Sequence, residues 1–225
     1  MTTNDRLTRR RFARPATWVG LSLVGVGSLA TTSYPRETTL QHVPTVFGIV
    51  MLVWWSRRES NVSASAFAAA ATFLALHLIG AHWIYSFVPY DRWFETLTGD
   101  GLSSRFDWQR NHYDRLVHAA SGVCGMPVLS EWFQRCAGVS PQWAAGLAMM
   151  GVLGVGAVYE IVEWQIAITF SPAMAEAYNG QQGDVWDPQK DLAMAWMGAI
   201  VTWPIVAFRS REPVVRQQPS SSPIR

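Results

Sequence analysis

The segment Trp143–Phe170, WAAGLAMMGVLGVGAVYEIVEWQIAITF, carries two charged residues, Glu160 and Glu163, in an otherwise apolar run. A helix of that length can cross about 30 Å of hydrocarbon. The composition agrees, since 49% of the residues are hydrophobic and 15% are charged, against about 25% charged residues in soluble domains. The sequence therefore indicates an integral membrane protein.

Six segments are predicted to span the membrane as helices: Thr17–Tyr34, Val43–Trp55, Ala64–Val88, Arg115–Phe133, Trp143–Phe170 and Asp191–Phe208. The expected fold is an all-α bundle of six transmembrane helices, with a structured outer loop between spans three and four. Residues 17–208 form this domain. Residues 1–16 form an Arg-rich cytoplasmic segment, and residues 209–225 form a Ser/Pro/Arg-rich cytoplasmic tail that is expected to be disordered.

The orientation follows from the distribution of basic residues. Twelve Lys and Arg residues fall on the side of the two termini and six on the other side. Because cytoplasmic loops carry the excess of Lys and Arg, both termini are expected in the cytoplasm and the protein in the bacterial inner membrane. Eleven of the twelve Trp residues fall near the predicted ends of spans, as two interfacial belts would require.

The N-terminus has a second interpretation. Thr8–Arg14 resembles a twin-arginine export signal, and Ser28–Ala30 resembles a cleavage site. We favour an uncleaved first helix with an Arg-rich cytoplasmic anchor, because multi-pass proteins rarely need such a signal. Cleavage would leave five spans.

Two classes of protein are excluded by charge and cysteine content. A net charge of +2 supplies no basic face for nucleic acid. A disulfide-linked secreted domain is excluded because Cys124 and Cys136, the two cysteines, would lie about 18 Å apart on one helix, too far for a disulfide. Together with the apolar composition, the sequence predicts membrane lipids, and no nucleic acid, as partners.

Ionisable residues gather at one depth. Because successive spans run in opposite directions, one end of the bundle should collect these groups from four spans: His77, His82 and Tyr85; Asp114 and His118; Glu160 and Glu163; Asp184, Asp187 and Asp191. Charged groups inside a membrane are costly, so such a cluster is a functional hypothesis. Of the two histidines in span three, His82 is preferred for the cluster because it lies closer to the level of Asp114.

The cluster has three interpretations. As a metal site for Zn, Mn or Fe, its candidate ligands are His82, Asp114, His118, Asp187 and Asp191. Glu160 and Glu163 are then the catalytic acid–base candidates, and further polar-centre candidates are His77, Tyr85, His112, Arg110, Arg115, Asp184 and Lys190. The second interpretation is transport or proton relay. The third is structural, with arginines of the outer loops neutralising the acids.

The outer loops mix aromatic and charged residues. Val88–Phe94 and Phe106–Tyr113 are typical of an amphipathic lid in the membrane interface, and simple interfacial packing is the alternative. Asp184 or Asp187 is also placed to cap the last span.

Four motifs in this order are similar to those of the YjdF-like bacterial inner-membrane proteins: Leu76–Trp93, Arg110–His118, Tyr159–Trp164 and Gln182–Asp191. The resemblance runs from about residue 40 to 208. That family is known as membrane proteins of unknown function, so the resemblance implies a topology and no reaction.

A looser resemblance is to the VanZ-like membrane proteins. It rests on Asp114-Arg115-x-x-His118 and Glu160-x-x-Glu163, where Arg115 replaces a Lys and Glu163 replaces a Gln. It implies work near the envelope or its lipids.

The sequence thus predicts an inner-membrane protein with a polar centre near the outer face, acting as a metal-assisted enzyme on a lipid, an envelope precursor or another membrane-held substrate. A structural or assembly role is the first alternative, and a transporter or proton relay the second. In a structure, His82, Asp114, His118, Glu160, Glu163 and one of Asp187 or Asp191 should converge, and Arg110 or Arg115 should reach the glutamates.

Overall fold

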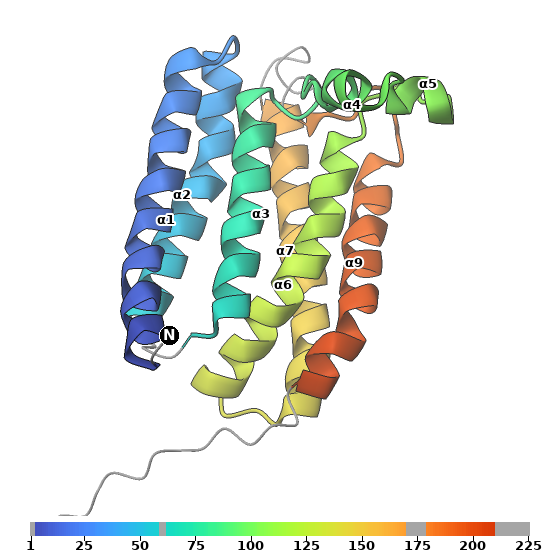
Figure 1. The fold of residues 1–225 in the computed structure, drawn as a ribbon. Coiled ribbons are helices and arrows are strands. Elements are labelled where there is room, and N and C mark those ends of the chain that lie inside the picture. Colours follow the sequence, from blue (N-terminus) through green and yellow to red (C-terminus); the bar gives the residue numbers. More distant parts are fainter. Residues whose placement is uncertain (1–2, 59–61, 170–178, 210–225) are drawn as a thin grey trace, which may run out of the picture.

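The computed structural model describes residues 3–58, 62–169 and 179–209. These residues form helices and connecting turns, with no strand among them. The helices are α1 (Thr3–Thr31), α2 (Pro35–Arg58), α3 (Ala64–His82), α4 (Tyr90–Thr98), α5 (Leu102–Phe106), α6 (Tyr113–Cys136), α7 (Pro141–Thr169) and α9 (Asp187–Arg209). Figure 1 shows the six long helices side by side, with the short α4 and α5 lying across one end of the bundle.

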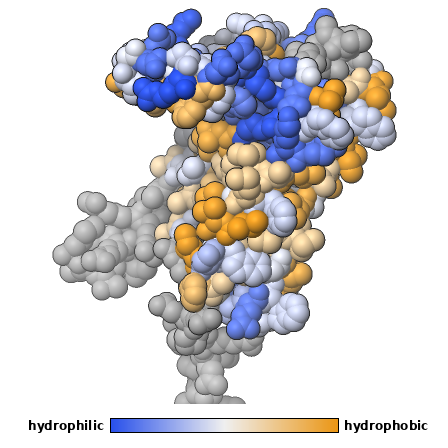
Figure 2. Space-filling view, turned by 90° about the vertical axis from the view of Figure 1, so that its right-hand side faces the viewer, coloured by the Kyte–Doolittle hydropathy of each residue, from blue (hydrophilic) through white to orange (hydrophobic). Residues whose placement is uncertain are grey.

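Three of the long helices have the length and apolar composition of membrane spans. They are α3, α7 and, within α9, Asp187–Phe208, while α1 contains a shorter apolar stretch, Pro15–Thr31. These helices support a helical membrane protein. Figure 2 agrees: polar residues gather at the α4–α5 end, and apolar residues cover much of the body below it on that face.

The bounds of the helices differ from the predicted ones, and two of the differences, in α2 and α3, affect the polar interior. The helix predicted from Val43 begins at Pro35, which brings polar residues such as Gln41 into the bundle, where it is buried. The helix predicted to reach Val88 ends at His82. Beyond it Tyr85 has a φ of +58°, and its N–H donates to the Gly80 carbonyl.

Gly80 permits this turn. A Cβ on Gly80 would lie 2.7 Å from the Tyr85 ring, so the ring occupies the place of a side chain. The chain leaves α3 abruptly and enters α4 at Tyr90. The connection predicted to be structured therefore contains two helices, α4 and α5, that lie across the end of the bundle.

The packing centres on α6. It contacts α3, α7 and α9, while α1 and α2 pack against α3 and each other. The closest approach is between α6 and α9: a Cβ on Gly122 would lie 2.0 Å from the Ala195 carbonyl oxygen, and one on Gly198 would lie 2.2 Å from the Ala119 oxygen. Small residues permit such a crossing. It lies one helical turn from His118 and two turns from Asp191.

The tail predicted for residues 209–225 lies outside the described residues, except for Arg209 at the end of α9. At the other end of the chain, α1 is already helical at Thr3 and continues through Pro15 to Thr31. The predicted N-terminal segment 1–16 is therefore continuous with the first long helix over its described part.

Candidate functional site

A buried group of acidic and imidazole side chains lies at the α4–α5 end of the bundle. We call Asp114 and His118 of α6, Glu160 of α7 and Asp191 of α9 the carboxylate–histidine cluster. His118 Nε2 lies 3.6 Å from Asp114 Oδ1 and 3.7 Å from Glu160 Oε1. All four residues are buried, Asp191 with 2% of its surface exposed. Three helices thus bring their polar side chains to one place.

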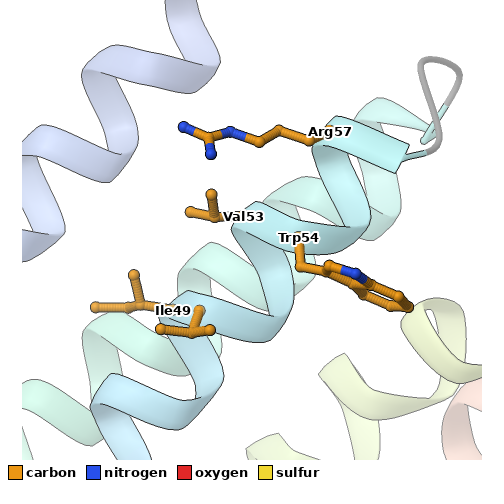
Figure 3. Close-up of a pocket in the computed structure, with 5 residues that line it drawn as sticks. Ile49, Val53, Trp54 and Arg57 are labelled. Atoms are coloured by element: carbon orange, nitrogen blue, oxygen red, sulfur yellow. The ribbon is translucent and has the colours of Figure 1, made fainter.

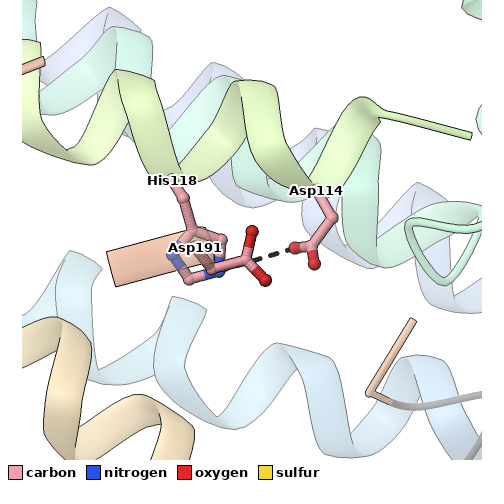
Figure 4. Close-up of side chains that lie close together, drawn as sticks. All are labelled: Asp114, His118 and Asp191. Carbon is pink, nitrogen blue, oxygen red and sulfur yellow. Dashed lines mark ion pairs between the residues drawn. The ribbon is translucent and has the colours of Figure 1, made fainter. Parts of the chain in front are cut away.

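Three members of the cluster are arranged as metal ligands could be. One potential ligand atom each from Asp114, His118 and Asp191 lies within 4.8 Å of the other two. Figure 4 shows Asp114 and His118 extending from α6 toward Asp191. Ligands at about 2.0–2.2 Å from an ion stand up to about 4.4 Å apart, so a small side-chain rotation would close the set. Nitrogen with two carboxylates suits Zn, Mn or Fe.

Glu163 extends this group along α7. It is half-buried and lies one helical turn from Glu160. Of the predicted converging residues, Asp114, His118, Glu160 and Asp191 are brought together.

A second group lies between the cluster and the end of the bundle. We call Arg110, Arg115, Asp184, Asp187 and Lys190 the arginine clamp. Asp187 Oδ1 accepts hydrogen bonds from Arg110 Nη1 at 2.7 Å and from Arg115 Nη2. Asp184 Oδ2 accepts from Arg115 Nη2 at 3.0 Å and from Lys190 Nζ at 2.6 Å. Within the clamp, each carboxylate faces cations.

The clamp keeps the carboxyl group of Asp184, in the loop before α9, ionised. Its pKa falls from 3.8 to about 2, chiefly because Lys190 donates a hydrogen bond to its carboxylate, with further bonds from the Trp186 N–H and Arg115. Asp184 is thus held ionised at neutral pH.

The two groups meet at Arg115. Its Nε lies 2.9 Å from Asp191 Oδ1, but the geometry is that of an ion pair without a hydrogen bond. Arg115 forms ion pairs with Asp184, Asp187 and Asp191. Among the side chains that the structure describes, no arginine forms the predicted ion pair with Glu160 or Glu163.

The cluster has more acids than cations. Asp114, Glu160 and Asp191 face His118 and one edge of Arg115. Asp191 Oδ1 and Glu160 Oε1 are buried and have no hydrogen-bond partner within the described part of the chain. A buried carboxylate must be paired, bound to a cation or neutralised by protonation. The surplus of acids in the cluster is therefore compatible with a bound cation.

The loops at this end close over the cluster. Gln182 exchanges two hydrogen bonds with the Asn111 backbone, at 2.8 and 3.0 Å, and Arg110 Nη2 donates to the Gly180 carbonyl. Gly180 has a φ of +68°, and a Cβ there would lie 3.9 Å from Asp114 Oδ2. The segment from Gly180 therefore covers Asp114.

His112 and Tyr90 join the remaining loops. The His112 N–H donates to the Tyr90 hydroxyl, and its ring stacks obliquely on Trp108. Burial, and then the positive charges of Arg110 and Arg115, lower the pKa of His112. Neutral His112 therefore serves as part of the loop packing.

The two histidines of α3 lie elsewhere. The His77 ring bonds to the Tyr85 hydroxyl through Nδ1 and donates to the Gln41 carbonyl through Nε2. His82, preferred from the sequence, lies at the end of α3 with its ring edge-on to Trp83. Neither belongs to the ligand group of Asp114, His118 and Asp191, and the partners of the His77 ring are Tyr85 and Gln41 instead.

Some polar residues near the cluster were not singled out from the sequence. The Tyr159 hydroxyl donates to Gln41 Oε1 at 3.2 Å, which joins α7 to α2, and its ring lies edge-on to His118. Four buried polar residues share one face of α2: Thr38, Gln41, His42 and Thr45. They are three, four and seven residues apart, which places them on one side of a helix. This spacing could have identified them from the sequence.

Ser86 and Asn179 also border the site. Ser86 Oγ and Asn179 Oδ1 are buried without a hydrogen-bond partner among the described residues. A Cβ on Gly180 would lie 3.4 Å from Ser86 Oγ. Both residues lie outside the long helices, where spacing along the chain carries no information about spatial proximity.

Comparisons with known proteins agree with the helical membrane architecture. The model of the family described as predicted membrane protein (DUF2238) matches residues 15–212. The chain is 28% identical over 172 residues to the inner membrane protein YjdF of Escherichia coli (strain K12), a similarity that covers 76% of this chain and 78% of YjdF.

No solved structure matches this chain. The looser resemblance to VanZ-like proteins receives no support from these comparisons. The resemblance to YjdF-like proteins is confirmed. With a family model matched over nearly all of its described residues, this chain belongs to the DUF2238 family of predicted membrane proteins.

Proposed function

We propose that this protein crosses the bacterial inner membrane six times and binds a divalent cation at the carboxylate–histidine cluster. The six long helices α1, α2, α3, α6, α7 and α9 are the proposed spans, with both termini in the cytoplasm and α4 and α5 at the outer surface. The excess of basic residues on the side of the termini supports this orientation.

One observation carries the cation assignment: ligand atoms of Asp114, His118 and Asp191, from two different helices, lie within 4.8 Å of one another. The oxygen of Glu160 beside them, which has no hydrogen bond among the described residues, and the surplus of carboxylates support it. A divalent cation would neutralise two of these charges and would contact Asp191 Oδ1 and Glu160 Oε1, which lack hydrogen bonds in the part of the chain that the structure describes. Zn, Mn and Fe fit the donor atoms.

The cation would serve a metal-assisted reaction. A bound cation polarises a substrate oxygen or lowers the pKa of a coordinated water. Glu160, 3.7 Å from His118 Nε2, is placed to take a proton from a water bound there, and Glu163 lies one turn further along α7. These two glutamates are the proposed acid–base residues.

The substrate class follows from the position of the cluster. It lies inside a membrane domain near one end of the bundle, below the exposed α4 and α5, which present Trp93, Leu97 and Phe106. Apolar residues of this kind favour the membrane interface. A lipid head group or a membrane-held envelope precursor is therefore the proposed substrate.

Elemental analysis of the protein purified in mild detergent tests the proposal. Wild-type protein should hold a stoichiometric transition metal, and the variants His118→Ala and Asp191→Asn should lose it. Asp100→Asn, in the exposed connection between α4 and α5, is the matched control and should retain the metal. Equal metal content in all four proteins, or none after growth with added Zn, Mn and Fe, would overturn the cation assignment.

A structural role is the second candidate, and the ion pairs of the arginine clamp support it. Through Asp184 and Asp187 they join the start of α6 and the loop before it to the start of α9, and such a network stabilises the fold without a cation. In that case the wild-type protein contains no metal, and Asp191→Asn changes only its thermal stability.

A further inference from the structure

We propose a second binding site, for an anionic phospholipid, on α2 at the end of the bundle opposite α4 and α5. A groove of about 430 Å³ lies there, and the described residues that line it are Ile49, Val50, Val53, Trp54 and Arg57. The proposal rests on the six-span arrangement above, which places α2 in the bilayer. It is independent of the cation.

The walls of the groove are apolar except at one end. Ile49, Val50 and Val53 form its length, and Arg57 closes it at the terminus of α2. Figure 3 shows the Arg57 side chain extending across the groove above Val53, toward a neighbouring helix. An apolar groove at the surface of a membrane helix is filled most favourably by hydrocarbon.

Arg57 determines which lipid fits. Its side chain is exposed, and it forms no ion pair with another side chain that the structure describes. A guanidinium can hold a phosphate oxygen pair with two parallel hydrogen bonds. Glu131, a carboxylate among the described residues, is already engaged by Arg135 and by Ser63.

The position of Trp54 supports the same occupant. Its indole lines the groove beside Val53 and Arg57 and is partly exposed. Tryptophan favours the level of the head groups, where its ring contacts chains and its N–H stays near water. A phospholipid acyl chain along Ile49, Val50 and Val53 would therefore place its phosphate at Arg57, and basic residues near this surface favour anionic head groups.

The experiment measures the thermal stabilisation of delipidated protein in detergent by added phosphatidylglycerol and by phosphatidylcholine with the same chains. Wild-type protein should be stabilised more by phosphatidylglycerol. Arg57→Gln should lose this preference while keeping the smaller effect of phosphatidylcholine. Val53→Trp, which fills the groove, should reduce both effects. Arg92→Gln, at an exposed arginine of α4, is the control and should behave as wild type.

Three results would overturn the proposal: an unchanged lipid preference in Arg57→Gln, an equal loss in Arg92→Gln, or full stabilisation by glycerol phosphate without chains. Metal content separates this proposal from the cation site, because Arg57→Gln should keep any metal that wild-type protein holds. If the wild-type protein held no metal, the predicted preference for phosphatidylglycerol should still be observed.

Discussion

Gly122 in α6 lies directly against Gly198 in α9: a Cβ on Gly122 would stand 2.9 Å from the carbonyl carbon of Gly198 and 2.6 Å from the Ala199 nitrogen. These neighbours are backbone atoms, which cannot turn aside as a side chain can. The crossing therefore sets the separation of the two helices that carry His118 and Asp191.

Gly122→Ala should destabilise the protein, because a methyl group there forces α6 and α9 apart. Overpacking of this kind costs about 1–3 kcal/mol, and more when backbone must move. The same shift should weaken any metal binding by Asp114, His118 and Asp191. Thermal unfolding in detergent and metal content measure the two effects.

Gly154 of α7 is the matched control, because nothing lies within 4 Å of a Cβ built there. Gly154→Ala should leave stability unchanged or raise it slightly, since Ala favours a helix interior by about 0.5–1 kcal/mol. A similar loss in both variants would mean that the α6–α9 crossing is not the limiting contact.

Arg115→Ala should cost about 3–5 kcal/mol, the range for breaking a buried ion pair, because Arg115 contacts Asp184, Asp187 and Asp191. Arg92→Ala, on exposed α4, should cost less than about 1 kcal/mol. Thermal or denaturant unfolding of both variants measures the difference. Equal shifts would show that Arg110 and Lys190 alone satisfy these acids.

The Asp184 carboxylate predicts a pH dependence. Its pKa in the folded protein, about 2, lies below the 3.8 of the free group, so ionised Asp184 stabilises the fold. This contribution is complete above about pH 4 and is lost as the pH falls toward about 2. The melting temperatures of wild type and Asp184→Asn should therefore differ above pH 4 and converge near pH 2.

Lys190→Met should reproduce much of that difference, because the Lys190 hydrogen bond is the main cause of the lowered pKa. A difference between wild type and Asp184→Asn that stays constant over this pH range would contradict the assignment.

The thiol of Cys136 reports the orientation of the bundle. Cys136 ends α6 and is exposed, and the proposed topology places it in the cytoplasm. A membrane-impermeant maleimide should label it only after the cells are permeabilised. Leu97→Cys, at a position of α4 that is 84% exposed, should be labelled in intact cells when made in a Cys136→Ser background. Labelling of Cys136 in intact cells would show that the bundle has the opposite orientation.

Much of the architecture could be predicted from the lengths of apolar segments. Each expected span overlaps one of the long helices that the structure describes, and three of these helices have the composition of membrane spans; a sixfold crossing stays a prediction. Boundaries were less predictable. The αL conformation at Tyr85 ends α3 at His82, and it depends on the contact of the Tyr85 ring with Gly80, which no local propensity reveals.

The sequence by itself predicted that Asp114, His118, Glu160 and Asp191 lie at one end of the bundle, because helices that alternate in direction return their ends to the same level. Only the tertiary structure decided which acids pair with arginines and which face His118. Asp187 faces Arg110 and Arg115, while Glu160 and Asp191 face His118 and Asp114. That division depends on the rotation of each helix about its axis, which is set by backbone contacts such as Gly122 with Gly198 and not by residue spacing within any one helix.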